Sequence, residues 1–214
     1  MHDLTLCLIN LPAGDLMQGG NGLAGVPGME LEFHRGLEQA IQYATALNVP
    51  SVNILAGKQP IDSDLLPCLN TLSSNLKLAC HRLSDHHIQP VFEMINSTDM
   101  PRFLVQNIAQ AQEMLEAVQH PALKMQYDCY HMAMMGEDVL EALKENIHDI
   151  GHIQFADCPG RHEPDTAQIH FAEIFQWLNQ SAYSGYIAAE YRPQAHSSHS
   201  FAWKDKYFAK HPQS

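Results

Sequence analysis

Short β-like runs alternate with amphipathic helical segments along the whole chain of 214 residues. Because these runs are apolar almost throughout, they are typical of strands buried on both faces, as in parallel sheets covered by helices. The alternation therefore predicts an α/β fold with a parallel sheet, in a single domain that spans residues 1–214. Six such runs are present, at residues 4–11, 51–57, 88–96, 122–132, 151–157 and 185–192.

The segments between the runs place apolar residues on one helical face. In residues 29–48 the apolar positions recur at i, i+3 and i+4 spacing, and residues 103–119, 137–150 and 171–179 follow the same rule. The repeat length fits the βα units of a TIM-type (β/α) barrel. A doubly wound sheet is the competing architecture, but no G-x-G-x-x-G opens a helix after a strand. The apolar positions of the first segment are Leu37, Ala40, Ile41, Ala44 and Leu47.

A long Gly-rich connection, residues 11–28, follows the first strand. It is not a phosphate-binding P-loop, because no G-K-[ST] ends it. Two interpretations remain open: a flexible surface loop, or a lid over an active site.

Composition narrows the class of function. The chain has 12 basic and 24 acidic residues, a formal net charge of -12, which disfavours nucleic acid as a partner. No apolar run reaches 18 residues, so no transmembrane helix is expected, and the N-terminus lacks the features of a secretory signal. The 5 cysteines contain no C-x-x-C and suit a reduced compartment. We therefore expect a cytoplasmic protein without membrane contacts.

Four polar residues fall at or near the carboxyl ends of four successive predicted strands: Glu93, Asp128, Gln154 and Glu190. In barrel enzymes the active site forms at that face from several strand ends. Since side chains alternate between the faces of a strand, each of the four can point into the barrel. The sequence therefore predicts three carboxylates and one amide oxygen in a single pocket.

Three carboxylates do not crowd together without a compensating cation. Mg²⁺ and Mn²⁺ prefer shells made of oxygen, and this set offers only oxygen ligands, which favours them over zinc. Any one of these residues taken alone is more often a cap, a turn former or an ion-pair partner. Four at matching places on four strands are much harder to explain by coincidence.

Several strings in the chain resemble the hydroxypyruvate isomerase family, within the xylose isomerase-like barrel superfamily. They are "FEMINSTDMP", "LKMQYDCYHM", "IGHIQFADCPGRHEP", "AAEYRP" and "NLPAGD", with "AGK" and a proline after the second strand. The resemblance covers nearly the whole chain. It implies that Glu93, Asp128, Gln154 and Glu190 are the ligands of Mg²⁺ or Mn²⁺, and that Glu93 and Glu190 are the acid/base pair.

The implied reaction is an aldose–ketose type isomerisation of a small hydroxy-oxo acid, hydroxypyruvate to tartronate semialdehyde. One glutamate takes a proton from the hydroxyl-bearing carbon and the other returns one to the neighbouring carbon. We predict that His131 and Arg161 bind substrate, Arg161 as a bidentate partner of its carboxylate. Alternatives are isomerisation of a four-carbon oxo acid, C3 epimerisation of a ketose, or an inactive barrel acting as a binding or assembly subunit.

The chain departs from the family in its number of strands. The family builds eight βα units and this chain supplies six, so the counterparts of the first two strands are expected to be missing. An incomplete barrel exposes two sheet edges. We expect a homo-oligomer that covers the gap, a rearranged closed sheet, or an inactive product.

Overall fold

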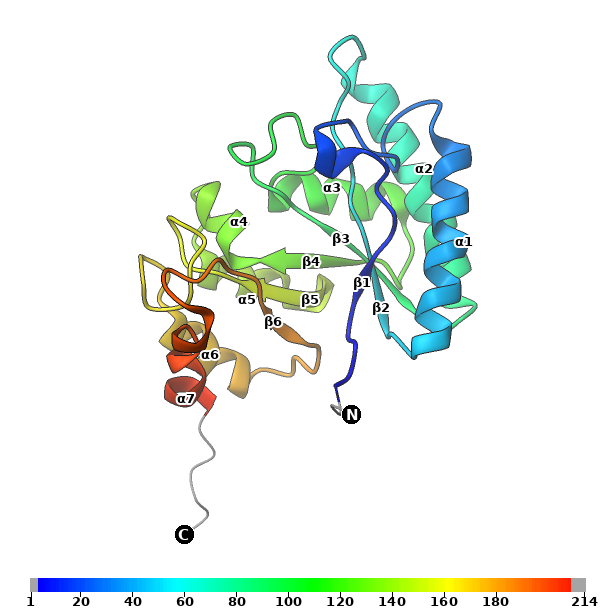
Figure 1. Ribbon diagram of the computed structural model, residues 1–214. Coiled ribbons are helices and arrows are strands. Elements are labelled where there is room, and N and C mark those ends of the chain that lie inside the picture. The colour runs from blue at the N-terminus through cyan, green and yellow to red at the C-terminus, as the bar shows by residue number, and fades with distance from the viewer. Residues whose placement is uncertain (1–3, 209–214) are drawn as a thin grey trace.

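In the computed structural model, residues 4–208 are described. They contain a single sheet of six parallel strands in chain order, with β1 and β6 at its two edges (Figure 1). The predicted α/β fold with an incomplete TIM-type barrel is confirmed. The strands are β1 (Ile9–Asn10), β2 (Ser51–Ile54), β3 (Gln89–Glu93), β4 (Lys124–Asp128), β5 (Ile150–Phe155) and β6 (Ile187–Ala189).

Helices connect the strands and cover the outside of the curled sheet (Figure 1). They are α1 (Glu30–Leu47), α2 (Leu65–Ser84), α3 (Ile108–Val118), α4 (Cys129–Met134), α5 (Val139–Asn146), α6 (Phe171–Gln180) and α7 (Ala202–Phe208). Three short 3-10 helices complete the set: η1 (Leu16–Gln18), η2 (Ile147–Asp149) and η3 (Ser197–His199).

The helices bury the apolar faces that their spacing predicts. Four of the five apolar positions expected on α1 are buried, but Leu47 is 55% exposed because it ends the helix, at the left-handed residue Asn48. On α3 the buried face begins at Ile108, since Asn107 caps the helix by accepting the N–H of Gln110. The helical segments predicted from the sequence do not include α2, although Leu72 and other apolar residues of this helix are fully buried.

All six strands are shorter than the apolar runs suggest. The prediction of a strand up to residue 132 is wrong, because Asp128 ends β4 and caps α4 by accepting the N–H of Tyr130. The edge strands β1 and β6 also shrink, to 2 and 3 residues, since each has only one neighbouring strand in the described part of the chain. The β-like run therefore marks where a strand lies but not where it ends.

The Gly-rich connection packs against the protein and is not a loose surface loop. It buries Leu16 and Leu23, and the carboxylate of Asp15 accepts the N–H of Gly22 at 3.2 Å. Lys58 ties the connection to the segment after β2, because its Nζ donates to the carbonyl of Gly19 at 3.1 Å. Met17 stays 74% exposed and lines the cavity described below. The connection thus forms one wall of that cavity.

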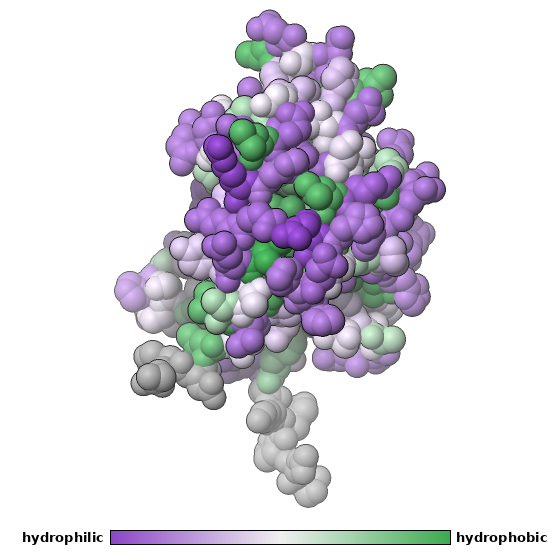
Figure 2. Space-filling model, turned by 90° about the vertical axis from the view of Figure 1, so that its right-hand side faces the viewer, coloured by the Kyte–Doolittle hydropathy of each residue, from purple (hydrophilic) through white to green (hydrophobic). Residues whose placement is uncertain are grey.

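The helical face of the molecule is mainly polar. Figure 2 shows the side on which α1 and α2 lie, with hydrophobic residues scattered among hydrophilic ones. Leu31, Tyr43 and Leu47 of α1 are exposed. Within residues 4–208, no helix combines the length and apolar character needed to cross a bilayer.

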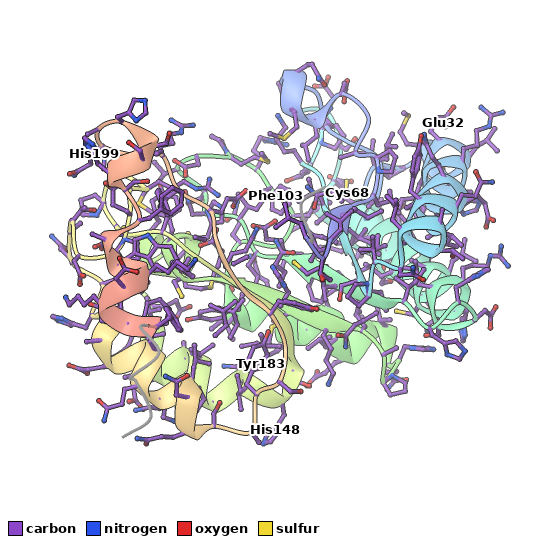
Figure 3. The ribbon with its side chains drawn as sticks, turned by 60° about the horizontal axis from the view of Figure 1, so that its bottom comes forward. Glu32, Cys68, Phe103, His148, Tyr183 and His199 are labelled. Carbon is purple, nitrogen blue, oxygen red and sulfur yellow. The ribbon has the colours of Figure 1, made fainter. Side chains whose placement is uncertain are left out.

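The two ends of the sheet differ in what they carry. His148 and Tyr183 precede β5 and β6, and Figure 3 places both on the same side of the molecule, far from His199. Every predicted site residue lies at the opposite, carboxyl ends of the strands or within the strands just before them. That end is where barrel enzymes bind their substrates.

Candidate active site

A cavity of about 460 Å³ opens at the carboxyl ends of the strands. Its walls include Glu93, the last residue of β3, and Glu190, which directly follows β6. His131 of α4 and Arg161 from the loop after β5 also line it. Asp128 lies beneath them, fully buried at the end of β4. The structure thus brings these five predicted residues to one place.

Glu93, Asp128 and His131 form the most compact group of this site. One ligand atom from each lies within 4.8 Å of the others, and all three side chains are buried. The Nε2 of His131 is 3.9 Å from Glu93 Oε1 and 3.8 Å from Asp128 Oδ2. The sequence interpretation proposed four oxygen ligands, and only two of them belong to this group.

Gln154 lies beside the group but directs its oxygen elsewhere. Its Oε1 accepts a hydrogen bond from Gln126 Nε2 at 2.6 Å, while the buried Oε1 of Gln126 has no hydrogen-bond partner among residues 4–208. An amide left unpaired in this way costs free energy. Turning both amides over would give Gln126 Oε1 a donor and would free the Gln154 oxygen to face an ion.

Glu190 is held away from the compact group by an arginine. Arg161 Nη2 donates to Glu190 Oε2 at 2.7 Å and lies 3.5 Å from Asp128 Oδ2. The guanidinium also stacks over the Tyr130 ring, at 5.1 Å from the ring centroid. Burial disfavours the charged form, but the nearby carboxylates outweigh it and raise the pKa of Arg161. No sequence pattern predicts that a single arginine contacts two of the acids.

The two buried carboxyl groups remain poorly compensated. Burial raises the pKa of Glu93 to about 8, and the charges of Asp128 and Glu190 add to this effect. Burial likewise raises the pKa of Asp128 to about 7, although Arg161 opposes the shift. A divalent cation beside both groups would favour their ionised forms.

Two neighbours of the site were not among the residues predicted from the sequence. Asn53 of β2 is buried, and its Nδ2 donates to Glu93 Oε2 and to Asn10 Oδ1, each at 3.1 Å. Arg192, two residues after Glu190, is exposed and also lines the cavity. Asn53 carried a usable signal, because it is a polar residue inside an apolar strand, like Glu93.

Asp157 anchors the loop that carries Arg161. It is fully buried, and its carboxylate accepts four backbone N–H groups at 2.8–2.9 Å. The anchored loop then holds the chain after Glu190, because the carbonyl of Arg161 accepts the N–H of Arg192 at 2.8 Å. Asp157 thus supports both Arg161 and the segment of Glu190. The donors are Cys158, Thr166, Ala167 and Ile169.

Replacing Asp157 by Asn is expected to loosen this loop. The amide keeps one acceptor oxygen but turns an NH₂ toward the N–H groups of Thr166 and Ala167, a loss of roughly 2–4 kcal/mol. Hydrogen exchange of those two amides should accelerate. Asp165→Asn is the matched control, since Asp165 is an exposed acid of the same loop that pairs with Lys206. Equal exchange in both variants would contradict the anchoring role.

The residues present fit a hard divalent cation. Two buried carboxylates lie close together at the carboxyl end of the sheet, and burial raises the pKa of both. Glu93 and Asp128 supply oxygen donors, which Mg²⁺ and Mn²⁺ prefer. A Gln154 amide turned over as described above would add a third oxygen donor.

The comparisons with known proteins agree with the fold. The family model described as xylose isomerase-like TIM barrel matches residues 1–207. The hydroxypyruvate isomerase of Escherichia coli strain K12 is 38% identical over 206 residues, which cover 96% of this chain and 80% of that protein. The 2-oxo-tetronate isomerase of Cupriavidus necator is 34% identical over 209 residues, covering 98% of this chain and 80% of that protein.

A solved structure shows the same architecture. The crystal structure titled AP endonuclease, family 2, from Brucella melitensis superposes with a TM-score of 0.91 at 30% identity, covering 96% of this chain and 80% of that one. Sequence and structure thus agree along nearly the whole chain. The chain belongs to the xylose isomerase-like TIM barrel family, in its hydroxypyruvate isomerase group.

Proposed function

We propose that this protein is a divalent-metal-assisted isomerase of small hydroxy-oxo acids, which interconverts hydroxypyruvate and tartronate semialdehyde. The observation that carries the proposal is the pair Glu93 and Glu190, which line one cavity at the carboxyl end of the sheet. The cavity, of about 460 Å³, suits a small acid. The identity to hydroxypyruvate isomerase of E. coli supports the choice of substrate.

The two glutamates divide the proton transfer between the two carbons. One takes a proton from C3 of hydroxypyruvate, which leaves an enediolate, and the other delivers a proton to C2. A proton also passes from the C3 oxygen to the C2 oxygen, so that an aldehyde replaces the primary alcohol. A base must be ionised to accept the proton, and a cation beside Glu93 would favour that form against the effect of burial.

Glu93 and Asp128 would hold the cation, with Gln154 and Glu190 completing the shell as the family resemblance implies. When bound, the cation supplies Lewis-acid polarisation of the substrate carbonyl. Mg²⁺ and Mn²⁺ are the candidates, because carboxylate and amide oxygens make up this proposed shell. Asn53 orients Glu93 through the hydrogen bond to Oε2, which leaves Oε1 of Glu93 facing His131.

His131 and Arg161 are the proposed substrate-binding residues. Burial lowers the pKa of His131 to about 4, so its imidazole is neutral and can donate to a substrate oxygen without adding charge. Arg161 is the cation nearest to Glu190. When a bound cation compensates the negative charge of the acids, the planar guanidinium of Arg161 is free to pair with the substrate carboxylate.

A four-carbon acid is the alternative substrate. The identity of 34% to the 2-oxo-tetronate isomerase of C. necator favours it, since the same proton transfer operates on a chain one carbon longer. The 3-epimerases among the solved structures are at most 20% identical, so they support the fold alone. An inactive barrel is the outcome that the following assay would reveal.

Removal of divalent cations is expected to lower turnover of hydroxypyruvate on the order of a hundredfold or more. The purified protein is treated with EDTA and assayed for tartronate semialdehyde, then assayed again with Mn²⁺ or Mg²⁺ restored. Parallel assays use 2-oxo-tetronate and a ketose. Undiminished turnover after EDTA would refute the metal requirement. A protein that turns over none of these substrates, with or without cations, would refute the isomerase proposal.

A further inference from the structure

Asn96, three residues after Glu93, is a fully buried side chain at the floor of the site. Its orientation is fixed by its own loop, because its Oδ1 accepts the N–H groups of Thr98 at 3.0 Å and Asp99 at 2.8 Å. A carbonyl oxygen accepts and an NH₂ group does not. The two backbone donors therefore identify which end of the amide is oxygen.

The other end of the same amide consequently consists of two N–H donors. One faces Asp99 Oδ2 at 3.0 Å and the other faces Nδ1 of His131 at 2.7 Å. The backbone N–H of Asn96 also points at Nδ1, at 3.4 Å. With two donors directed at it, Nδ1 of His131 must be an acceptor and carries no proton.

A neutral imidazole without a proton on Nδ1 has its proton on Nε2. The Nε2 atom is the one directed at the acids, 3.9 Å from Glu93 Oε1 and 3.8 Å from Asp128 Oδ2. An imidazolium is disfavoured by the same contacts, because a proton on Nδ1 would face both N–H groups of Asn96.

We propose that Asn96 is a positioning residue that locks His131 in the tautomer with the proton on Nε2. His131 then presents an N–H donor to the cavity. Although it lies close to the carboxylates of Glu93 and Asp128, its protonated Nε2 cannot ligate a cation. The cation is left to the oxygen donors, and the imidazole is reserved for a substrate oxygen. The catalytic consequence rests on the proposed function; the tautomer does not.

The test is a two-bond ¹H–¹⁵N NMR spectrum of the metal-free protein at pH 7, with His131 assigned from its absence in His131→Gln. We expect a pyrrole-type shift for Nε2 and a pyridine-type shift for Nδ1. Addition of saturating Mg²⁺ should leave the Nε2 proton in place. A proton on Nδ1, or loss of the Nε2 proton on addition of Mg²⁺, would overturn the proposal.

Asn96→Asp separates the positioning role from a structural one. Aspartate retains the oxygen that accepts from Thr98 and Asp99, but it replaces the NH₂ donor with an acceptor. The backbone N–H of residue 96 remains, but at 3.4 Å it is the longer of the two contacts with Nδ1. His131 should therefore move its proton to Nδ1, toward the new acceptor, and kcat/KM for hydroxypyruvate should fall roughly 10–100-fold. The wild-type spectrum tests the tautomer by itself, even where the variant does not fold.

Asn75→Asp is the matched control, because Asn75 is also a buried asparagine whose Nδ2 donates, there to the carbonyl of Ala24 at 2.8 Å. It should leave the His131 spectrum and kcat/KM unchanged. An unchanged His131 spectrum in Asn96→Asp, or a changed spectrum with unchanged kcat/KM, counts against the role of Asn96. If the wild type does not turn over hydroxypyruvate, the proposed function fails while the spectra still decide the tautomer.

Discussion

Glu93→Gln lowers kcat for hydroxypyruvate roughly 10²–10⁴-fold, because the amide can neither accept nor deliver the proton that moves between the two carbons. The variant should fold normally. Glu93 is buried beside Asp128 and the pKa of its carboxyl is raised to about 8, so the neutral amide replaces a group that is already largely protonated at pH 7. Initial rates with saturating Mn²⁺ and the unfolding temperature measure the two effects.

Glu190→Gln should lower kcat by a factor of the same order. Glu116→Gln serves as the control for both variants. Glu116 is an exposed glutamate on α3, remote from the cavity wall. Its substitution should change neither kcat nor the unfolding temperature. Wild-type rates in both Glu93→Gln and Glu190→Gln would eliminate the two-glutamate mechanism, whichever substrate is used.

The metal-free protein should lose stability relative to Glu93→Gln as the pH rises from about 4.5 to 8. The folded state holds a proton on Glu93 up to a pKa of about 8, whereas the ordinary pKa of a glutamate is 4.5, so the folded state binds more protons than the unfolded state throughout this window. Stability therefore falls with rising pH, by an amount on the order of a few kcal/mol. The pKa of Asp128, raised to about 7, adds a loss between about 3.8 and 7 that both proteins share.

The measurement is the free energy of unfolding of both proteins in EDTA at several pH values. Subtracting the variant from the wild type removes the titration of groups that the two share. Mn²⁺ should raise the free energy of unfolding of the wild type most strongly at the highest pH values, because its ligands are ionised carboxylates. A wild type that gains stability relative to Glu93→Gln between pH 5 and 8 would show that Glu93 is already compensated in the metal-free protein.

The sequence predicted most of the fold, because the period of apolar residues directly reflects burial. Glu93 and Asp128 were correctly placed at the ends of β3 and β4, since side-chain parity follows from strand geometry. Strand ends were less predictable. Asp128 shows why: the carboxylate that closes β4 also starts α4, a capping interaction that an apolar pattern does not contain.

The site was predictable as a set of residues but not as a set of contacts. Arg161 lies in a loop, and its pairing with Glu190 depends on the anchoring of that loop by Asp157, which no local pattern reveals. The orientation of Gln154 depends on Gln126 across the sheet. Asn96 gave no signal, because its role lies in which end of an amide faces a ring. Such details depend on tertiary neighbours.

The two proposed acid–base residues differ in how firmly they are embedded. Glu93 sits between two strands in the core, so substitutions near it alter folding and chemistry together. Glu190 follows the 3-residue edge strand β6. Its backbone N–H donates to the carbonyl of Phe155 at the end of β5, and its carboxylate pairs with Arg161 of the loop after β5. Sequence changes in that loop can therefore move Glu190 without disturbing the packing of the core. Substitutions that adapt the site to acids of other lengths would therefore be tolerated best on the β6 side, while Glu93 on the β3 side keeps its position.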